Sequence, residues 1–61
     1  MQRILVVDDD ADAAATLSDL LEDLGHEVCV VVEGRQALER ARAFRPAVVI
    51  MDLAPDLLTD L

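Results

Sequence analysis

Short apolar runs alternate with longer segments of mixed polarity along the chain. The runs cover residues 4–7 (ILVV), 28–32 (VCVVV) and 47–51 (AVVIM), and the second and third are rich in β-branched side chains. Short continuous apolar runs of this kind are typical of strands that are buried on both faces of a sheet. The pattern therefore predicts three buried strands.

The segment 11–24 predicts a helix, because apolar residues recur in it at spacings of four, three and four. Asp9 or Asp10 is positioned to cap its first turn, where acidic side chains also complement the helix dipole. Gly25 follows at the place where a left-handed residue commonly ends a helix. The predicted apolar stripe consists of Ala13, Leu17, Leu20 and Leu24.

A second helix is predicted over residues 35–45. Gly34 separates it from the preceding strand, and Pro46 ends it because proline disfavours helical geometry in the residue before it. Its predicted inner side consists of Ala37, Leu38, Ala41 and Phe44.

The order strand-helix-strand-helix-strand predicts the α/β class, with three parallel strands joined by right-handed crossovers. Three strands alone leave two arrangements open, 2-1-3 and 1-2-3. In an open parallel sheet, ligands bind beyond the carboxyl ends of the strands, where the strand order reverses. The order 2-1-3 is favoured because it brings the acidic residues at the ends of strands 1 and 3 together, where they can serve one ligand site.

Asp8, Asp9 and Asp10 end the first strand, and Asp52 ends the third. With strands 1 and 3 as neighbours, these acids share one crevice and repel one another. Either a proton or a cation then sits among them. Carboxylate oxygens in a small crevice suit Mg²⁺, and an aspartate beside Mg²⁺ is a known nucleophile for phosphoryl transfer.

A purely structural reading of the acids stands beside this one. Asp10 and Asp12 are expected to be residues of the helix amino terminus and nothing more. Asp8 and Asp9 could also be solvated capping residues, and Asp52 alone could be a turn former.

The composition narrows the classes of function. A chain of 61 residues with 54% hydrophobic residues and a net charge of −8 is one small acidic domain. The charge argues against a direct nucleic-acid partner. No leader and no apolar run of membrane-spanning length is visible, so a cytoplasmic location away from membranes is expected. Cys29, within an apolar run, is expected to be a buried and inert thiol.

Three stretches together resemble a known family: ILVVDDD, DLGHEV and EGRQALERARAFRPAVVIMDL. They are similar to the first half of bacterial two-component response-regulator receiver domains. The resemblance runs almost continuously from residue 3 to 53. It implies the first half of a flavodoxin-like fold, whose full strand order is 2-1-3-4-5.

The resemblance also implies roles for individual residues. Asp52 would be the phosphoacceptor, taking a phosphoryl group from a sensor histidine kinase or a phosphotransfer protein. Asp9 would bind Mg²⁺ directly and Asp8 mainly through water, with Asp52 and the backbone carbonyl of Ala54 completing the metal site. Such a domain signals and is not an enzyme; at most it assists its own phosphorylation.

The chain departs from the family in its second half. Receiver domains normally run to about twice this length, with a Ser or Thr on strand 4 and a Lys on strand 5, whereas this chain has no Lys. Pro55 stands three rather than four residues after Asp52. Residues 1–61 are therefore expected to form a partial, truncated receiver domain. The alternative function is a phosphorylation-silent interaction module that self-associates through the edge of strand 47–51.

Overall fold

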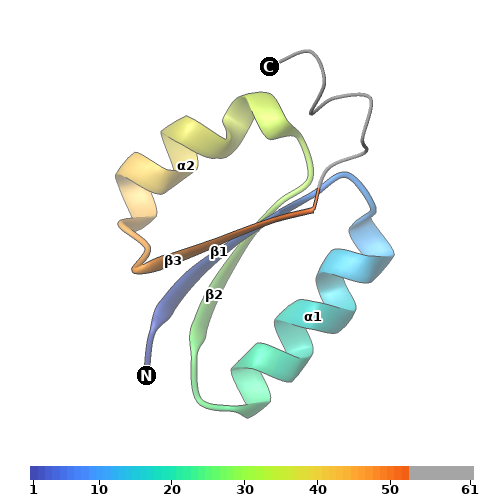
Figure 1. Cartoon of the computed structure of the whole chain (residues 1–61), viewed down its shortest axis with the longest axis vertical. Helices are drawn as coiled ribbons and strands as arrows, with labels where there is room; N and C mark the ends of the chain where they lie inside the picture. Colours follow the sequence, from blue (N-terminus) through green and yellow to red (C-terminus); the bar gives the residue numbers. More distant parts are fainter. Residues whose placement is uncertain (53–61) are drawn as a thin grey trace.

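The computed structural model describes residues 1–52. Three strands and two α-helices alternate along this part of the chain (Figure 1). The elements are β1 (Arg3–Asp8), α1 (Ala11–Asp23), β2 (Glu27–Val31), the short 3₁₀ helix η1 (Gly34–Gln36), α2 (Ala37–Phe44) and β3 (Val48–Asp52).

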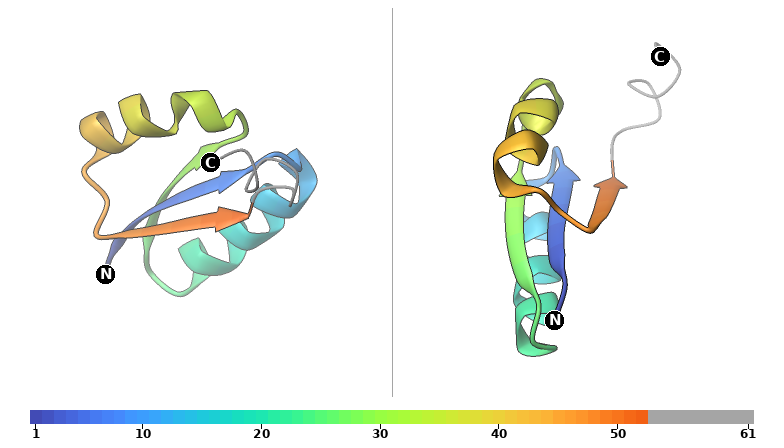
Figure 2. Two further views of the ribbon diagram at one scale, coloured as in Figure 1. Left: turned by 45° about the horizontal axis from the view of Figure 1, so that its top comes forward. Right: turned by 90° about the vertical axis from the view of Figure 1, so that its left-hand side faces the viewer.

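The three strands form one parallel sheet in the order β2-β1-β3. Figure 2 shows β1 between its two neighbours, with the strands pointing the same way. Leu5 lies opposite Cys29 on one side and Val49 on the other. The α/β class and the strand order 2-1-3 predicted from the acidic residues are both confirmed.

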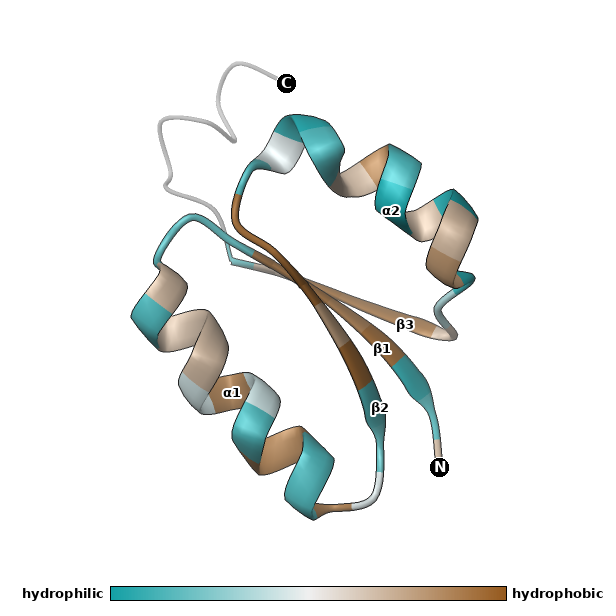
Figure 3. Ribbon diagram, turned by 180° about the vertical axis from the view of Figure 1, so that it is seen from behind, coloured by the Kyte–Doolittle hydropathy of each residue, from teal (hydrophilic) through white to brown (hydrophobic). Residues whose placement is uncertain are grey.

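β1 forms the centre of the core, with one helix packed against each of its faces. Ile4 and Val6 pack with Ala14 on the α1 side. Leu5 and Val7 pack on the other side, where side chains of α2 contact them. Leu5, Val6 and Val7 are at most 1% exposed, which explains why this run carries no polar residue. Figure 3 shows the apolar colouring of the strands between the two helices.

The side of α1 that packs on the sheet differs from the predicted stripe. Leu17 belongs to both, but Leu20 and Leu24 are 57% and 66% exposed and Ala13 is also exposed. The residues that face the sheet are Ala14, Leu17, Ser18 and Leu21. The small residues among them let α1 approach the strands closely. Ser18 is tolerated there because its hydroxyl donates to the Glu22 carboxylate, at 3.0 Å.

The ends of α1 follow the predicted signals. The Asp10 side chain accepts hydrogen bonds from the backbone N–H groups of Asp12 and Ala13, at 3.0 and 3.2 Å. Asp10, and not Asp9, is therefore the N-cap. At the other end Gly25 has a φ of 93°, the left-handed conformation predicted for it.

α2 is shorter than predicted, because residues 34–36 form η1 before the α-helix begins. It ends at Arg45, whose φ of 54° is left-handed, directly before Pro46. Ala37, Ala41 and Phe44 face the core as predicted. Leu38, which is 63% exposed, does not, since it lies a further 100° around the helix from Ala37.

The two outer strands are less buried than β1. Cys29 on β2 is half-buried, not fully buried as predicted, because β2 is an edge strand of a three-stranded sheet. On β3 the exposed fractions are 42% for Val48, 48% for Val49 and 55% for Met51. Both helices pack mainly on β1 and β2, which leaves β3 as an apolar edge.

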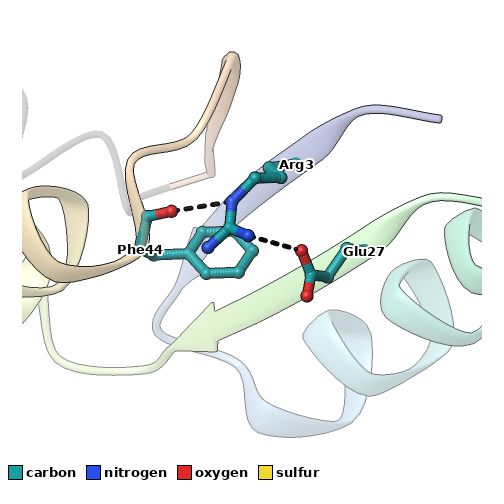
Figure 4. Close-up of polar contacts among 3 residues, drawn as sticks. All are labelled: Arg3, Glu27 and Phe44. Atoms are coloured by element: carbon teal, nitrogen blue, oxygen red, sulfur yellow. Dashed lines mark hydrogen bonds and ion pairs between the residues drawn. The ribbon is translucent and has the colours of Figure 1, made fainter.

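Arg3 links neighbouring elements at the end of the sheet opposite to the acidic residues (Figure 4). Its Nε donates to the Phe44 carbonyl at 2.9 Å, and its Nη1 pairs with the Glu27 carboxylate at 2.8 Å. The guanidinium carbon also lies 4.4 Å from the centroid of the Phe44 ring. One side chain thus ties the end of α2 to β1 and β2.

Candidate functional site

Asp8 and Asp52 end two neighbouring strands and are paired with each other in the parallel register of β1 and β3. This relationship follows from the strand order, because β1 lies directly beside β3 in the sheet. The carboxyl ends of parallel strands lie at the same edge of a sheet. The predicted meeting of the first acidic cluster with Asp52 therefore holds for this pair.

Asp8 is held in place by the turn that follows β1. The residue is only 4% exposed, and its Oδ1 accepts the backbone N–H of Asp10 at 2.9 Å. An aspartate that bonds to the backbone two residues on is a common turn-forming arrangement. Asp8 is therefore not the solvated capping residue that one interpretation of the sequence allowed. Its spacing from Asp10 is the sequence signal for this turn, and the hydrogen bond fixes its side chain.

The other two acids of the run have different environments. Asp9 is exposed, between the end of β1 and the start of α1. Asp10 uses its carboxylate to cap α1, and Asp12 lies in the first helical turn. The structural interpretation of Asp10 and Asp12 is thus the correct one, and the residues left for a functional site are Asp8, Asp9 and Asp52.

Asp52 is exposed at the last position of β3. Ala54, whose backbone carbonyl the family resemblance implies as a metal ligand, lies outside the described residues. Within residues 1–52, no three or more side chains of His, Cys, Asp or Glu gather closely enough to hold a metal ion. The described part of the site is therefore a carboxylate pair with a third acid next to it in sequence.

This donor set fits Mg²⁺. Mg²⁺ typically binds one or two carboxylates and keeps several waters or phosphoryl oxygens in its shell. Asp8 and Asp52 place carboxylates at the ends of two adjacent strands, and Asp8 is fixed by its bond to the Asp10 backbone. Sulfur and nitrogen ligands, which softer metals prefer, do not enter this pair.

Negative charge at this edge has no ion-pair partner in the part of the chain that the structure covers. The ion pairs there join Arg3 to Glu27 and Arg35 to Glu33. Neither pair includes Asp8 or Asp52. Two neighbouring carboxylates without a cationic partner attract a cation. A bound cation can then neutralise the negative charge of an incoming group.

The chain is an α/β domain with a sheet of order 2-1-3 and paired acids at the carboxyl edge of that sheet, and comparison with known proteins gives its family. The model of the response regulator receiver domain matches residues 4–56. The chain belongs to this family. Receiver domains serve phosphorelay signalling in two-component systems and are signalling domains, not enzymes in the usual sense.

Several curated proteins are similar to the chain. It is 48% identical over 52 residues to the DNA-binding response regulator MtrA of Mycobacterium tuberculosis, covering 85% of this chain and 23% of that protein. It is 46% identical over 52 residues to protein Rrf1 of Nitratidesulfovibrio vulgaris, covering 85% of this chain and 38% of that protein. The chain thus spans well under half the length of either relative.

Proposed function

We propose that this chain is a phosphorelay receiver in which Asp52 accepts a phosphoryl group. The observation that carries the proposal is the pairing of Asp52 with Asp8 across β1 and β3. It gives an exposed carboxylate, able to meet a donor, beside a buried and fixed one. Membership of the receiver family supports the same assignment.

In the proposed reaction a carboxylate oxygen of Asp52 attacks the phosphorus of a phosphohistidine. The new P–O bond makes an aspartyl phosphate, while the P–N bond breaks and the imidazole nitrogen leaves with the electron pair. The donor is a sensor histidine kinase or a phosphotransfer protein. Transfer of this kind depends mainly on positioning and on charge stabilisation. The end of β3 positions Asp52, and a bound cation would supply the charge stabilisation.

Asp8 and Asp9 are proposed to hold Mg²⁺ together with Asp52, Asp9 directly and Asp8 mainly through water. When bound, the ion neutralises charge on the phosphoryl oxygens. The carbonyl of Ala54 remains a predicted further ligand. We place this activity in the cytoplasm, where sensor kinases present their phosphohistidines. No helix described within residues 1–52 is long and apolar enough to cross a membrane.

The test is phosphorylation by a small-molecule donor. The chain is incubated with acetyl phosphate and MgCl₂, with and without EDTA, and followed by intact-mass spectrometry. We expect a mass increase of one phosphoryl group that requires Mg²⁺ and is removed by hydroxylamine, as an acyl phosphate should be. Asp52→Asn should abolish it.

Asp19→Asn is the matched control, because Asp19 is an exposed aspartate on α1, remote in sequence from both strand ends. It should be phosphorylated like the wild type. A modification that persists in Asp52→Asn, or a wild type that takes up no phosphoryl group, would contradict the assignment of Asp52.

A second candidate function is a phosphorylation-silent module that self-associates. The observation in its favour is the apolar edge of β3, where Val49 and Met51 are about half exposed. Sedimentation velocity over a range of concentrations tests it. This candidate requires association that is independent of Mg²⁺ and that Val49→Lys prevents, whereas a monomeric wild type at high concentration would exclude it.

A further inference from the structure

Asp10 connects the buried carboxylate of Asp8 to the first turn of α1. Its backbone N–H donates to Asp8 Oδ1 at 2.9 Å. Its own carboxylate accepts the N–H groups of Asp12 and Ala13, at 3.0 and 3.2 Å, and its carbonyl accepts the N–H of Ala14 at 3.0 Å. The N–H of this residue therefore bonds to the candidate site, while its carboxylate and carbonyl bond to the helix.

The helix cap fixes the direction in which the Asp10 N–H points. As the N-cap, Asp10 has a φ of −98° and a ψ of 105°, which is extended and not helical. The two hydrogen bonds to its carboxylate hold this conformation against the first turn of α1. Because the N–H belongs to the same residue, loosening of the cap also frees the group that holds Asp8.

The orientation of Asp8 depends on this hydrogen bond. Its side chain is only 4% exposed, so water can offer few replacement donors. In the part of the chain that the structure describes, the hydrogen bond to this carboxylate comes from Asp10. The bond engages Oδ1, and a carboxylate has a second oxygen. Asp8 can therefore accept this bond and face a ligand at the same time.

We propose that Asp10 is a positioning residue for the metal site, which acts on Asp8 through its backbone N–H and is not itself a ligand. This inference rests on the proposed function, in which the neighbouring carboxylates of Asp8 and Asp52 hold Mg²⁺. The coupling is reciprocal by thermodynamic linkage. If an intact cap strengthens Mg²⁺ binding, bound Mg²⁺ stabilises the cap by the same factor.

Backbone NMR of the whole chain measures the coupling in both directions. Titration with MgCl₂ at constant ionic strength, followed at the amides of Asp8 and Asp52, gives the dissociation constant of Mg²⁺ for the folded chain. Hydrogen exchange of the Asp12 and Ala13 amides, in EDTA and in Mg²⁺, reports on the cap. We expect exchange at both amides to slow in Mg²⁺, whereas exchange of the Leu24 amide, at the other end of α1, should change little.

Two substitutions of Asp10 separate positioning from charge. Asp10→Ala removes the cap and should weaken Mg²⁺ binding by about threefold to tenfold, which is the loss expected when a hydrogen bond no longer orients a ligand group. Asp10→Asn keeps a capping oxygen and removes the charge. Since Asp10 is exposed and its charge is screened, this variant should bind Mg²⁺ within about twofold of the wild type.

Gly25→Ala is the matched control for stability. Gly25 has a φ of 93°, a conformation in which a side chain is strained even though the space around this position is open. The change should destabilise the far end of α1 and lower Tm as Asp10→Ala does, yet leave the affinity for Mg²⁺ unchanged. Titrations are made at a temperature where thermal melts show every variant to be folded.

The contrary results are distinct from one another. Unchanged Mg²⁺ affinity in Asp10→Ala, or equal exchange at the cap with and without Mg²⁺, would overturn the proposal. Equal weakening in Asp10→Asn would overturn it in favour of a charge effect, and equal weakening in Gly25→Ala in favour of general instability. A wild type whose amides do not respond to Mg²⁺ would refute the metal site and this role with it. Phosphoryl uptake by Asp52 is measured separately by mass, so failure of the phosphoacceptor proposal is distinguishable from all of these.

Discussion

Asp8 and Asp52 face each other across β1 and β3, although the first is buried and the second exposed. The strand order sets this pair, because β1 lies directly beside β3 in the sheet. The Asp10 backbone then holds Asp8 at 2.9 Å. Two side chains of like charge thus end neighbouring strands at one edge of the sheet, and we expect this to have a consequence for stability.

Asp52→Asn should make the chain more stable in the absence of Mg²⁺. The change removes like-charge repulsion with Asp8 and leaves the bond from Asp10 intact. Paired side chains on neighbouring strands contribute about 0.2–1 kcal/mol, and the gain should be of that size. Urea unfolding in EDTA measures it. In millimolar Mg²⁺ the wild type should recover the difference, because the ion stabilises only the folded carboxylate pair.

The control for this comparison is Asp23→Asn, which removes the same charge from the exposed side of α1. It should gain the same stability from Mg²⁺ as the wild type does, because Asp8 and Asp52 are intact. A wild type whose stability in Mg²⁺ matches that in EDTA, with the ionic strengths balanced, would argue against a metal at Asp8 and Asp52.

Asp10→Ala should destabilise the chain through loss of the helix cap. Two backbone N–H groups, those of Asp12 and Ala13, lose their acceptor. Removal of an N-cap side chain costs about 1 kcal/mol, which in a domain of this size lowers Tm by about 4–8 °C. Circular dichroism melts should show this fall, while Asp10→Ser retains most of the stability. Asp9→Ala, at an exposed position, is the control, and an equal loss there would refute the assignment of Asp10 as the cap.

Arg3→Lys should lower the free energy of unfolding, although the substitution retains the positive charge. The guanidinium bonds to the Phe44 carbonyl, pairs with Glu27 and stacks on the Phe44 ring at once. A single ammonium cannot match that geometry. The ion pair itself is about half exposed and contributes little, so the expected loss of about 1 kcal/mol comes mainly from the bond to the carbonyl and from the ring contact. Urea unfolding measures this loss. The loss of stability should persist in high salt. Arg40→Lys, at an exposed position of α2, should cause no such loss.

The sequence predicted the parts of the fold that rest on strong local signals. Apolar runs located the strands, and Asp10 and Gly25 marked the ends of α1 because capping depends on a single residue type and its neighbours. Apart from the family resemblance, the strand order could be predicted only through the acids, since the apolar pattern of the strands fits either arrangement. The pairing of Asp8 with Asp52 followed from the same reasoning.

The sequence did not predict which side of α1 meets the sheet. Leu20 and Leu24 looked like core residues because helical periodicity records every apolar side of a helix. Which side is buried depends on tertiary contacts, here the close fit of Ala14 and Ser18 against the strands. The role of Arg3 escaped notice for a similar reason, since its partners Glu27 and Phe44 are remote in the sequence.

The orientation of α1 leads to a test with two adjacent alanines. Ala14 lies on the side of α1 that packs on the strands and is 0% exposed, whereas Ala13 is exposed. Ala14→Leu should overpack this contact and lower the free energy of unfolding by about 1–3 kcal/mol. Ala13→Leu adds the same atoms to the outside and should change it by less than about 0.5 kcal/mol. Leucine is as good a helix former as most residues, so helix propensity does not separate the two variants. Urea unfolding of both variants measures the difference. If Ala13→Leu were the more damaging change, α1 would have to pack on the sheet through the stripe of Leu20 and Leu24.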